Sequence, residues 1–125
     1  MRLLLFAGSA REGSHNKKLA RLGQKIAEAN GIEAVFADLA DYHMPIYHGD
    51  LEATEGVPER ARAFKALLGE YDGVMIVTPE YNAGIPALLK NTLDWVSRVQ
   101  TEPNVFQTRV FAIAGTSPGY FGAMR

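Results

Sequence analysis

The sequence predicts an α/β domain in which helices cover both faces of a parallel sheet. Short apolar runs alternate with stretches of helical periodicity, and this strand–helix order occurs four times, except that the last helix is missing. The run Val74–Val77 contains no polar residue, which is typical of a central strand buried on both faces. Loops rich in small and polar residues follow the first, third and fourth apolar runs. We expect one sheet with the strand order 2-1-3-4.

Length and composition are those of a single domain spanning residues 1–125. Hydrophobic residues make up 47% of the chain and charged residues 22%, which is enough for a core and ordinary for a soluble protein. The net charge is −1, so nothing indicates a nucleic acid or an anionic membrane as a partner. The chain has no cysteine, which excludes disulfides and thiolate catalysis, and it has no transmembrane stretch. We expect a cytoplasmic protein.

The first expected strand, residues 3–7, leads through a polar loop at residues 8–16 into a helix. This arrangement suits a phosphate, because the first turn of a helix leaves N–H groups unpaired and carries partial positive charge. Gly8 and Gly13 let the backbone approach an anion, and Arg11 adds a charged donor. Apolar residues at helical spacing predict the buried stripe of the helix: Leu19, Leu22, Ile26 and Ala27.

Two well-known phosphate-binding motifs do not fit this loop. The dinucleotide fingerprint needs a glycine two residues after Gly8, and none stands there. Gly8 and Gly13 have the Walker A spacing, but Ser14 and His15 follow where triphosphate chemistry needs a lysine and a hydroxyl residue. Neutral hydroxyls and one arginine suit a terminal phosphomonoester better. The loop alone is equally consistent with an ordinary turn in which Ser14 caps the helix.

Residues 32–36 are the second expected strand, and a long irregular segment at residues 40–56 follows it. The segment contains large apolar side chains, which is unusual for a solvated loop: Tyr42, Met44, Ile46 and Tyr47. We expect it to pack on something, such as a second subunit. His43 and His48 lack a third ligand at a sensible spacing, so we expect no metal site.

The remaining elements complete the alternation. A helix beginning at Pro58 precedes the third strand, and a helix beginning at Pro86 follows the loop at residues 78–84. The fourth strand, residues 109–114, ends in a loop at residues 115–122. In parallel sheets of this kind, ligands bind beyond the carboxyl ends of the strands. The loops at residues 78–84 and 115–122 should meet the loop at residues 8–16 there. The convergence of three loops favours a ligand site more than any one of them does.

Three motifs in these loops resemble those of the NADPH-dependent FMN reductase family, which comprises flavodoxin-like quinone and chromate reductases. The run Gly8–Asn16 matches each fixed position of the opening pattern G-S-x-R-x-x-S-x-N. The runs Pro79–Pro86 and Leu89–Trp95 resemble a second signature, and Thr116–Gly119 resembles a looser third one. The resemblance covers essentially the whole chain and implies a flavodoxin-like three-layer sandwich that binds FMN.

The resemblance also implies which residues hold the cofactor. Those expected at the FMN phosphate are Ser9, Arg11, Ser14, His15 and Asn16. Those expected at the isoalloxazine ring are Pro79, Glu80, Tyr81 and Asn82, with Ser117 on its other side. A flavin needs a flat, mostly neutral slot with backbone donors near its polar edge, and small residues allow that approach. Lys90 and Asp94 are one helical turn apart, so we expect them to pair with each other rather than to act in catalysis.

The family implies more chain than this sequence contains. Family members continue after the third loop with a helix, a fifth strand and a final helix, whereas this sequence ends at Arg125. We therefore expect an incomplete domain without the fifth strand, in which the strand at residues 109–114, apolar after Arg109, forms an exposed edge that favours association. The apolar residues at 42–47 and the helix that carries Trp95 further predict a homodimer or a homotetramer.

By this resemblance the chain is an FMN-dependent oxidoreductase. NADPH or NADH would pass a hydride to flavin N5, and the reduced flavin would reduce a quinone, a free flavin or a similar small-molecule acceptor. The cofactor carries this chemistry, so no catalytic acid or base is assigned. The alternative is a flavodoxin-type electron carrier without a substrate of its own. The net charge of −1 disfavours it, because carriers that dock on redox partners usually have a strongly acidic surface.

Overall fold

The computed structural model describes residues 1–101 and 103–119. Its strands are β1 (Arg2–Ala7), β2 (Glu33–Ala37), β3 (Gly73–Val77) and β4 (Val110–Ala114). Its helices are α1 (His15–Ala29), the 3-10 helix η1 (Leu39–Tyr42), α2 (Gly49–Glu55), α3 (Glu59–Gly69), α4 (Ala87–Arg98) and α5 (Val105–Thr108). Within the described ranges, no helix has the length and apolar character needed to cross a membrane.

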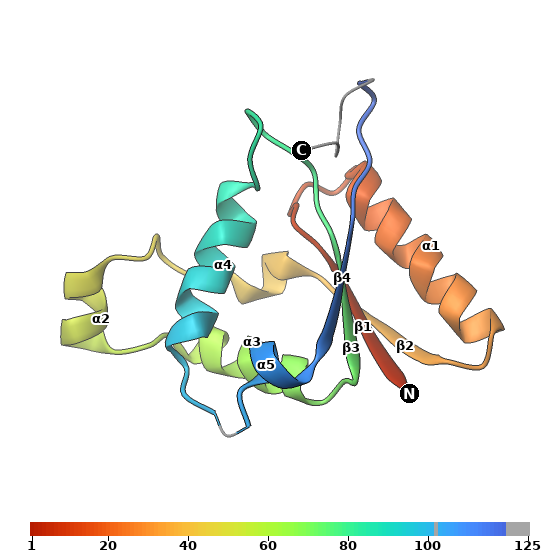
Figure 1. Cartoon of the computed structure of the whole chain (residues 1–125). Coiled ribbons are helices and arrows are strands. Elements are labelled where there is room, and N and C mark those ends of the chain that lie inside the picture. The colour runs from red at the N-terminus through yellow and green to blue at the C-terminus, as the bar shows by residue number, and fades with distance from the viewer. Residues whose placement is uncertain (102, 120–125) are drawn as a thin grey trace.

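The strands form one parallel sheet in the order β2-β1-β3-β4, as predicted. The register pairs Leu4 of β1 with Val35 of β2 and with Val74 of β3. Helix α1 lies on one face of the sheet, and α3, α4 and α5 lie on the other (Figure 1). This gives the predicted three-layer sandwich. Because the strands are parallel, the loops after β1, β3 and β4 all leave the sheet at the same edge.

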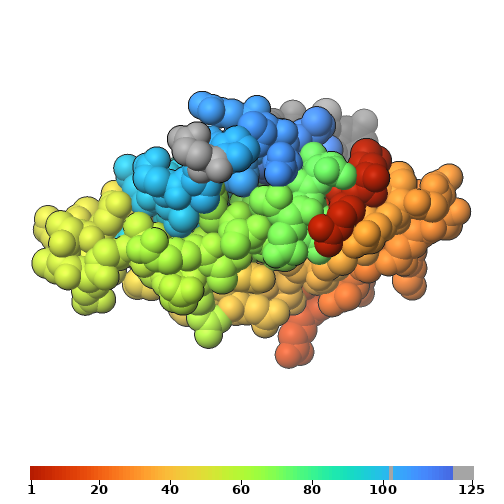
Figure 2. All heavy atoms as spheres, turned by 90° about the horizontal axis from the view of Figure 1, so that it is seen from below, coloured from red at the N-terminus to blue at the C-terminus, as the bar shows by residue number. Residues whose placement is uncertain are grey.

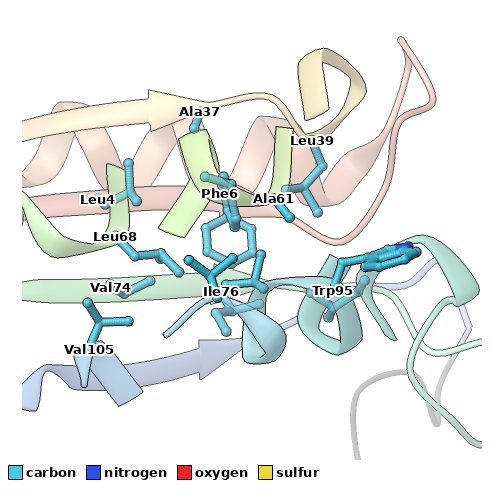
Figure 3. Packing of buried hydrophobic residues seen from close by; sticks show 14 of the residues in the cluster. Leu4, Phe6, Ala37, Leu39, Ala61, Leu68, Val74, Ile76, Trp95 and Val105 are labelled. Atoms are coloured by element: carbon cyan, nitrogen blue, oxygen red, sulfur yellow. The ribbon is translucent and has the colours of Figure 1, made fainter. Parts of the chain in front are cut away.

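The larger core lies between the sheet and the helices α3 and α4. Alternate side chains of β1 and β3 point to this face, among them Phe6 and Ile76 (Figure 3). Phe6 meets Phe64 of α3 edge to face, with the ring centroids 5.2 Å apart. Trp95 of α4 is fully buried in the same cluster. Since burying one such aromatic side chain contributes about 1.5–3 kcal/mol, this face holds much of the hydrophobic stabilisation.

Helix α1 covers the other face, but not with the stripe that the apolar spacing predicts. Leu22 and Ile26 are 52% and 56% exposed, so this part of the prediction was wrong, whereas Ala27 is buried. Small residues face the sheet instead, and a Cβ added at Gly23 would lie 3.0 Å from the Leu5 side chain. The helix packs so closely on the sheet that large side chains are left on its outer surface.

The segment after β2 is more regular than predicted, because it contains η1 and α2. It packs on α4 of its own chain. Trp95 donates from Nε1 to the Pro45 carbonyl (2.8 Å), and the Asn91 side chain accepts from the Tyr47 N–H (2.7 Å). The expected packing is therefore present, with α4 as the partner of this segment, and Trp95 is buried rather than part of a subunit surface. Helix α2 projects from one end of the molecule (Figures 1 and 2).

Strand β4 is an edge of the sheet, as predicted. Val110 and Ile113 are 75% and 76% exposed, and the alternation along a strand places them on opposite faces. Both faces of this edge strand thus carry exposed apolar side chains. The predicted loop after β4 is described as far as Gly119, and its residues 120–122 lie outside the described part of the chain.

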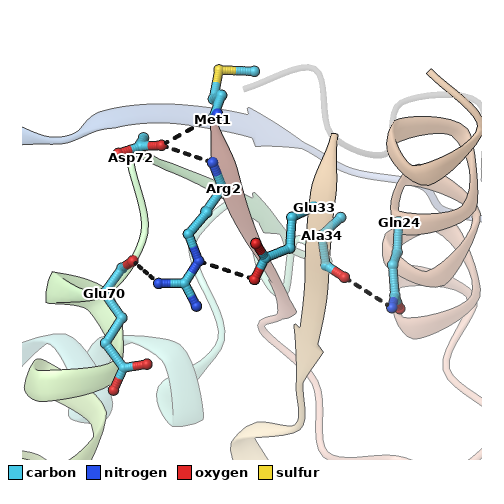
Figure 4. Close-up of polar contacts among 7 residues, drawn as sticks. All are labelled: Met1, Arg2, Gln24, Glu33, Ala34, Glu70 and Asp72. Carbon is cyan, nitrogen blue, oxygen red and sulfur yellow. Dashed lines mark hydrogen bonds and ion pairs between the residues drawn. The ribbon is translucent and has the colours of Figure 1, made fainter. Parts of the chain in front are cut away.

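Polar contacts of Arg2 join the amino-terminal ends of β1 and β2 to the turn before β3 (Figure 4). Arg2 donates from Nε to the Glu33 carboxylate (3.0 Å) and from Nη1 to the Glu70 carbonyl (2.9 Å). Its backbone N–H donates to the Asp72 carboxylate (2.7 Å). These contacts connect β1 with β2 and with the turn before β3.

Candidate cofactor site

The site begins where β1 ends, at Gly8. The Gly8 N–H donates to the Val77 carbonyl (2.9 Å), which extends the pairing of β1 and β3 by one residue. A Cβ at this position would lie 2.6 Å from Thr78 Oγ1 and 3.2 Å from the Leu89 side chain. Only glycine fits this close approach, and the loop turns away from the sheet immediately after it.

The loop ends at a capped helix N-terminus. The Ser14 hydroxyl accepts a hydrogen bond from the Lys17 N–H (3.3 Å), so Ser14 is the N-cap of α1. The Arg11 guanidinium donates to the Gly13 carbonyl (3.3 Å) and is exposed at the surface of the loop. Neutral donors and one cation thus surround the start of α1, where the peptide dipoles add partial positive charge.

A cavity of about 250 Å³ lies among the loops after β1, β3 and β4. Nine of the residues that the sequence predicts at the cofactor line it: Ser9, Arg11, Ser14, His15, Asn16, Pro79, Glu80, Tyr81 and Ser117. Asn82, which was predicted with them, is exposed outside this lining. Thr116 and Pro118 line the cavity as well, and their place in the third motif was the sequence signal for them. That these residues bind FMN stays a prediction.

Asn16 joins two of the loops that form the cavity. Its amide donates to the Thr116 carbonyl and accepts from the Thr116 N–H, both at 3.0 Å, and the residue is 3% exposed. The side chain thus fastens the start of α1 to the loop after β4. The motif did not reveal this contact, because an asparagine amide suits a peptide group as well as an anion.

The loop after β3 forms a tight turn beside the cavity. Tyr81 and Gly84 exchange both backbone hydrogen bonds, at 2.9 and 3.1 Å. Asn82 and Ala83 between them have φ values of 51° and 61°, which is the pattern of a two-residue type I′ turn. A left-handed conformation of a non-glycine residue costs about 1–3 kcal/mol and persists where the surroundings impose it. Tyr81, which is 56% exposed, therefore begins a turn whose two central residues have a strained backbone conformation.

A second cavity of about 310 Å³ adjoins the first, since Pro79 and Glu80 line both. Its walls also include Thr78 and the apolar side chains of Ile85 and Ile113. One carboxylate oxygen of Glu80 is buried, and none of the residues that the structure describes donates a hydrogen bond to it. A buried polar atom without a partner is costly, so this oxygen fits a site that a donor on a ligand completes.

The two cavities together fit a phosphorylated flat cofactor such as FMN. The first offers hydroxyl groups, Arg11 and the start of α1 to a phosphate, and the second offers a mixed polar and apolar wall to a ring. A parallel α/β sheet of order β2-β1-β3-β4 with cavities at the carboxyl ends of its strands is typical of a flavodoxin-like domain.

The chain belongs to the NADPH-dependent FMN reductase family, whose family model matches residues 1–125. It is 36% identical over 125 residues to the quinone reductase of Escherichia coli (strain K12), covering 100% of this chain and 64% of that protein. It is 38% identical over 122 residues to a 2-hydroxy-1,4-benzoquinone reductase of a Burkholderia species, covering 98% of this chain and 63% of that protein. The chain thus spans less than two thirds of the length of these curated relatives.

A solved structure supports the same assignment. FerB, a flavoenzyme NAD(P)H:(acceptor) oxidoreductase from Paracoccus denitrificans, matches with a TM-score of 0.77 at 34% identity. The match covers 96% of this chain and 63% of that one. The family and the flavodoxin-like fold predicted from the sequence are therefore confirmed.

Proposed function

We propose that the domain to which these residues belong is an FMN-dependent NAD(P)H oxidoreductase that reduces a quinone, a free flavin or a similar small acceptor. One observation carries the proposal: the polar cavity at the start of α1 is lined by residues of all three family motifs. The acceptor class is supported by the names of two relatives, both of which are quinone reductases.

The residues of this chain bind and orient the cofactor in this proposal. Arg11 and the N–H groups at the start of α1 neutralise the phosphate, and Ser9, Ser14, His15 and Asn16 lie around it. FMN held by these residues would supply the redox chemistry, which is hydride transfer from NADPH or NADH and reduction of the acceptor. Pro79, Glu80 and Tyr81 would lie along the ring and Ser117 on its other side, whereas Asn82 is exposed outside the cavity lining. The buried Glu80 oxygen, which lacks a donor among the described residues, would accept a hydrogen bond from the flavin.

The test is to purify the chain in the presence of FMN and to measure its visible absorption under anaerobic conditions. We expect a flavin band that bleaches when NADPH or NADH is added and returns when a quinone is added. Mass analysis of the ligand released by denaturation should give FMN. Recovery of FAD, or the absence of bound flavin, would contradict the cofactor assignment. A flavin band that neither nucleotide bleaches would favour the electron-carrier alternative.

We further propose that the protein assembles as a homodimer or a homotetramer. Apolar side chains that are exposed in the single chain support this, among them Ile46 and Ile113, each 76% exposed. Light scattering at micromolar concentration should give at least the mass of a dimer. A monomer mass over the whole concentration range would contradict the proposal.

A further inference from the structure

A buried lysine contacts the loop between β1 and α1 from outside the cavity. Lys17, in the first turn of α1, is 8% exposed and does not line the cavity. Its Nζ donates to the Ala10 carbonyl (3.0 Å) and to the Asp38 carboxylate (2.6 Å). Ala10 stands between Ser9 and Arg11 in the loop, and Asp38 directly follows β2. Lys17 therefore ties the middle of the loop to the end of the neighbouring strand.

Lys17 needs its partner, because its position is unfavourable for a lone charge. The helix dipole disfavours a cation in the first turn, and burial of an unpaired charge is costly. Asp38 supplies the counter-charge, and its other carboxylate oxygen accepts from the Ala40 N–H (3.0 Å). Burial alone would raise the pKa of Asp38, but hydrogen bonds from Lys17 and Ala40 and the charges of Lys17 and Arg21 outweigh it and lower the pKa. The pair is thus held ionised in one geometry.

The contact fixes one peptide plane of the loop. In a planar trans peptide, the C=O and the following N–H point in opposite directions. Because Lys17 holds the Ala10 carbonyl, the Arg11 N–H points away from Lys17, and no acceptor in the described part of the chain takes it. A carbonyl turned toward an anion would repel it, whereas a free N–H binds it.

We propose that Lys17 is a positioning residue for the phosphate of the cofactor, with Asp38 as the group that holds it in place. Lys17 keeps the Ala10 carbonyl away from the anion and leaves the N–H of Arg11 available. The inference rests on the proposed function, since it assigns a residue to the phosphate end of the same site. A direct ligand role is disfavoured, because two of the three Nζ donors already serve protein acceptors and Lys17 does not line the cavity.

The decisive comparison is between FMN, which has the phosphate, and riboflavin, which lacks it. Lys17→Met keeps the apolar stem and removes the ammonium group. We expect its affinity for FMN to fall about tenfold or more, since a charge-assisted hydrogen bond to the loop is lost, and its affinity for riboflavin to stay within about twofold. Lys18→Met is the matched control, because it makes the same charge change at the next, exposed position of α1. It should leave the ratio of the two affinities unchanged.

Inorganic phosphate gives a readout that does not depend on the flavin. It should raise the melting temperature of the wild type and of Lys18→Met, but much less that of Lys17→Met. If the wild type binds phosphate and not FMN, the proposed function fails. The role of Lys17 is then tested by the rise in melting temperature that phosphate causes in the wild type and in the two variants. If the wild type binds neither, both proposals are overturned.

Asp38→Asn separates positioning from simple charge attraction and serves if Lys17→Met does not fold. If Asp38 holds Lys17 in place, the variant should bind FMN more weakly than the wild type. If Lys17 acts by its charge on the phosphate, removal of the neighbouring anion should tighten binding, which would overturn the proposal. Three other results would also overturn it. Lys17→Met could lose affinity for FMN and riboflavin equally, or for neither. Lys18→Met could lose as much FMN affinity as Lys17→Met.

Discussion

The two ends of the sheet differ in how their polar groups are used. At the amino-terminal end, Arg2 bonds a carboxylate and a carbonyl through its guanidinium and a second carboxylate through its backbone N–H. At the carboxyl-terminal end, Arg11 makes a 3.3 Å contact with Gly13 of its own loop. One oxygen of Glu80 there is buried and takes no donor from the described residues. Arg2 thus bonds groups of three other residues at the first end, whereas the Arg11 guanidinium at the second end contacts one carbonyl of its own loop.

This difference predicts that substitutions at the two ends of the strands affect stability and ligand binding differently. Exposed ion pairs contribute little to stability, so the amino-terminal end should tolerate substitution and have no effect on the cofactor. At the carboxyl-terminal end, we expect the exposed Arg11 to gain its strongest partner when a ligand binds. Substitutions there should therefore change ligand affinity more than folding, unless they alter the way in which the loops leave the sheet.

Arg11→Ala should have the largest effect on binding and little effect on folding. It removes a charge-assisted contact with the phosphate, which is worth roughly 1.5–3 kcal/mol, so FMN affinity should fall about tenfold or more. Fluorescence titration with FMN measures this. Arg62→Ala, on the exposed side of α3, is the matched control and should bind FMN like the wild type. An unchanged dissociation constant for Arg11→Ala would show that this residue does not bind the phosphate.

Gly8→Ala should be the exception at this end, because it disturbs the point where the loop leaves the sheet. Its Cβ would meet Thr78 Oγ1 at 2.6 Å. We expect a loss of about 1–3 kcal/mol in the free energy of unfolding, which is typical of overpacking. Gly13→Ala is the control, since a Cβ there meets nothing within 4 Å and its stability should be unchanged. Urea unfolding of both variants measures the difference, and equal stabilities would contradict the packing argument.

Acid should weaken the contact between Lys17 and Asp38. The pKa of Asp38 is lowered in the folded protein, so its contribution to stability is fully present above the ordinary aspartate pKa of about 3.9 and is lost as the pH falls through the folded value. Between pH 5 and pH 3, the wild type should therefore lose more stability than Asp38→Asn. Urea unfolding at several pH values tests this, and parallel curves would contradict it.

Arg2→Ala should have the smallest effect of the series. Its partners at the amino-terminal end are exposed, so we expect a small decrease in melting temperature and no change in the dissociation constant of FMN. Calorimetry and the same fluorescence titration measure the two quantities. A marked loss of FMN affinity in this variant would contradict the claim that the amino-terminal end of the sheet has no part in FMN binding.

The strand order and the convergence of three loops on one cavity could be predicted because they depend on patterns that extend along the chain. Alternating apolar runs and helices determine a parallel sheet, and loops after parallel strands must meet at one edge. The buried face of α1 was mispredicted for a local reason. Hydrophobicity favoured Leu22 and Ile26, but the close approach of the helix at Gly23 selects small residues instead.

The individual contacts of the site depend on geometry that the sequence does not contain. Nothing in the run Gly8–Asn16 indicates that Asn16 bonds the backbone of Thr116, one hundred residues away. The contact of Lys17 with Asp38 likewise joins residues from two different strand–helix units. Lys90 and Asp94 did pair as predicted, at 2.5 Å, because helical spacing alone brings them together.

The central claim is that the carboxyl-terminal end of the sheet binds a flavin through its phosphate. The most direct test is the ratio of the dissociation constants of riboflavin and FMN for the wild-type chain, measured by fluorescence titration in one buffer. Since the phosphate contributes charge-assisted hydrogen bonds, FMN should bind about tenfold or more tightly than riboflavin. Equal affinities for the two flavins would contradict the account.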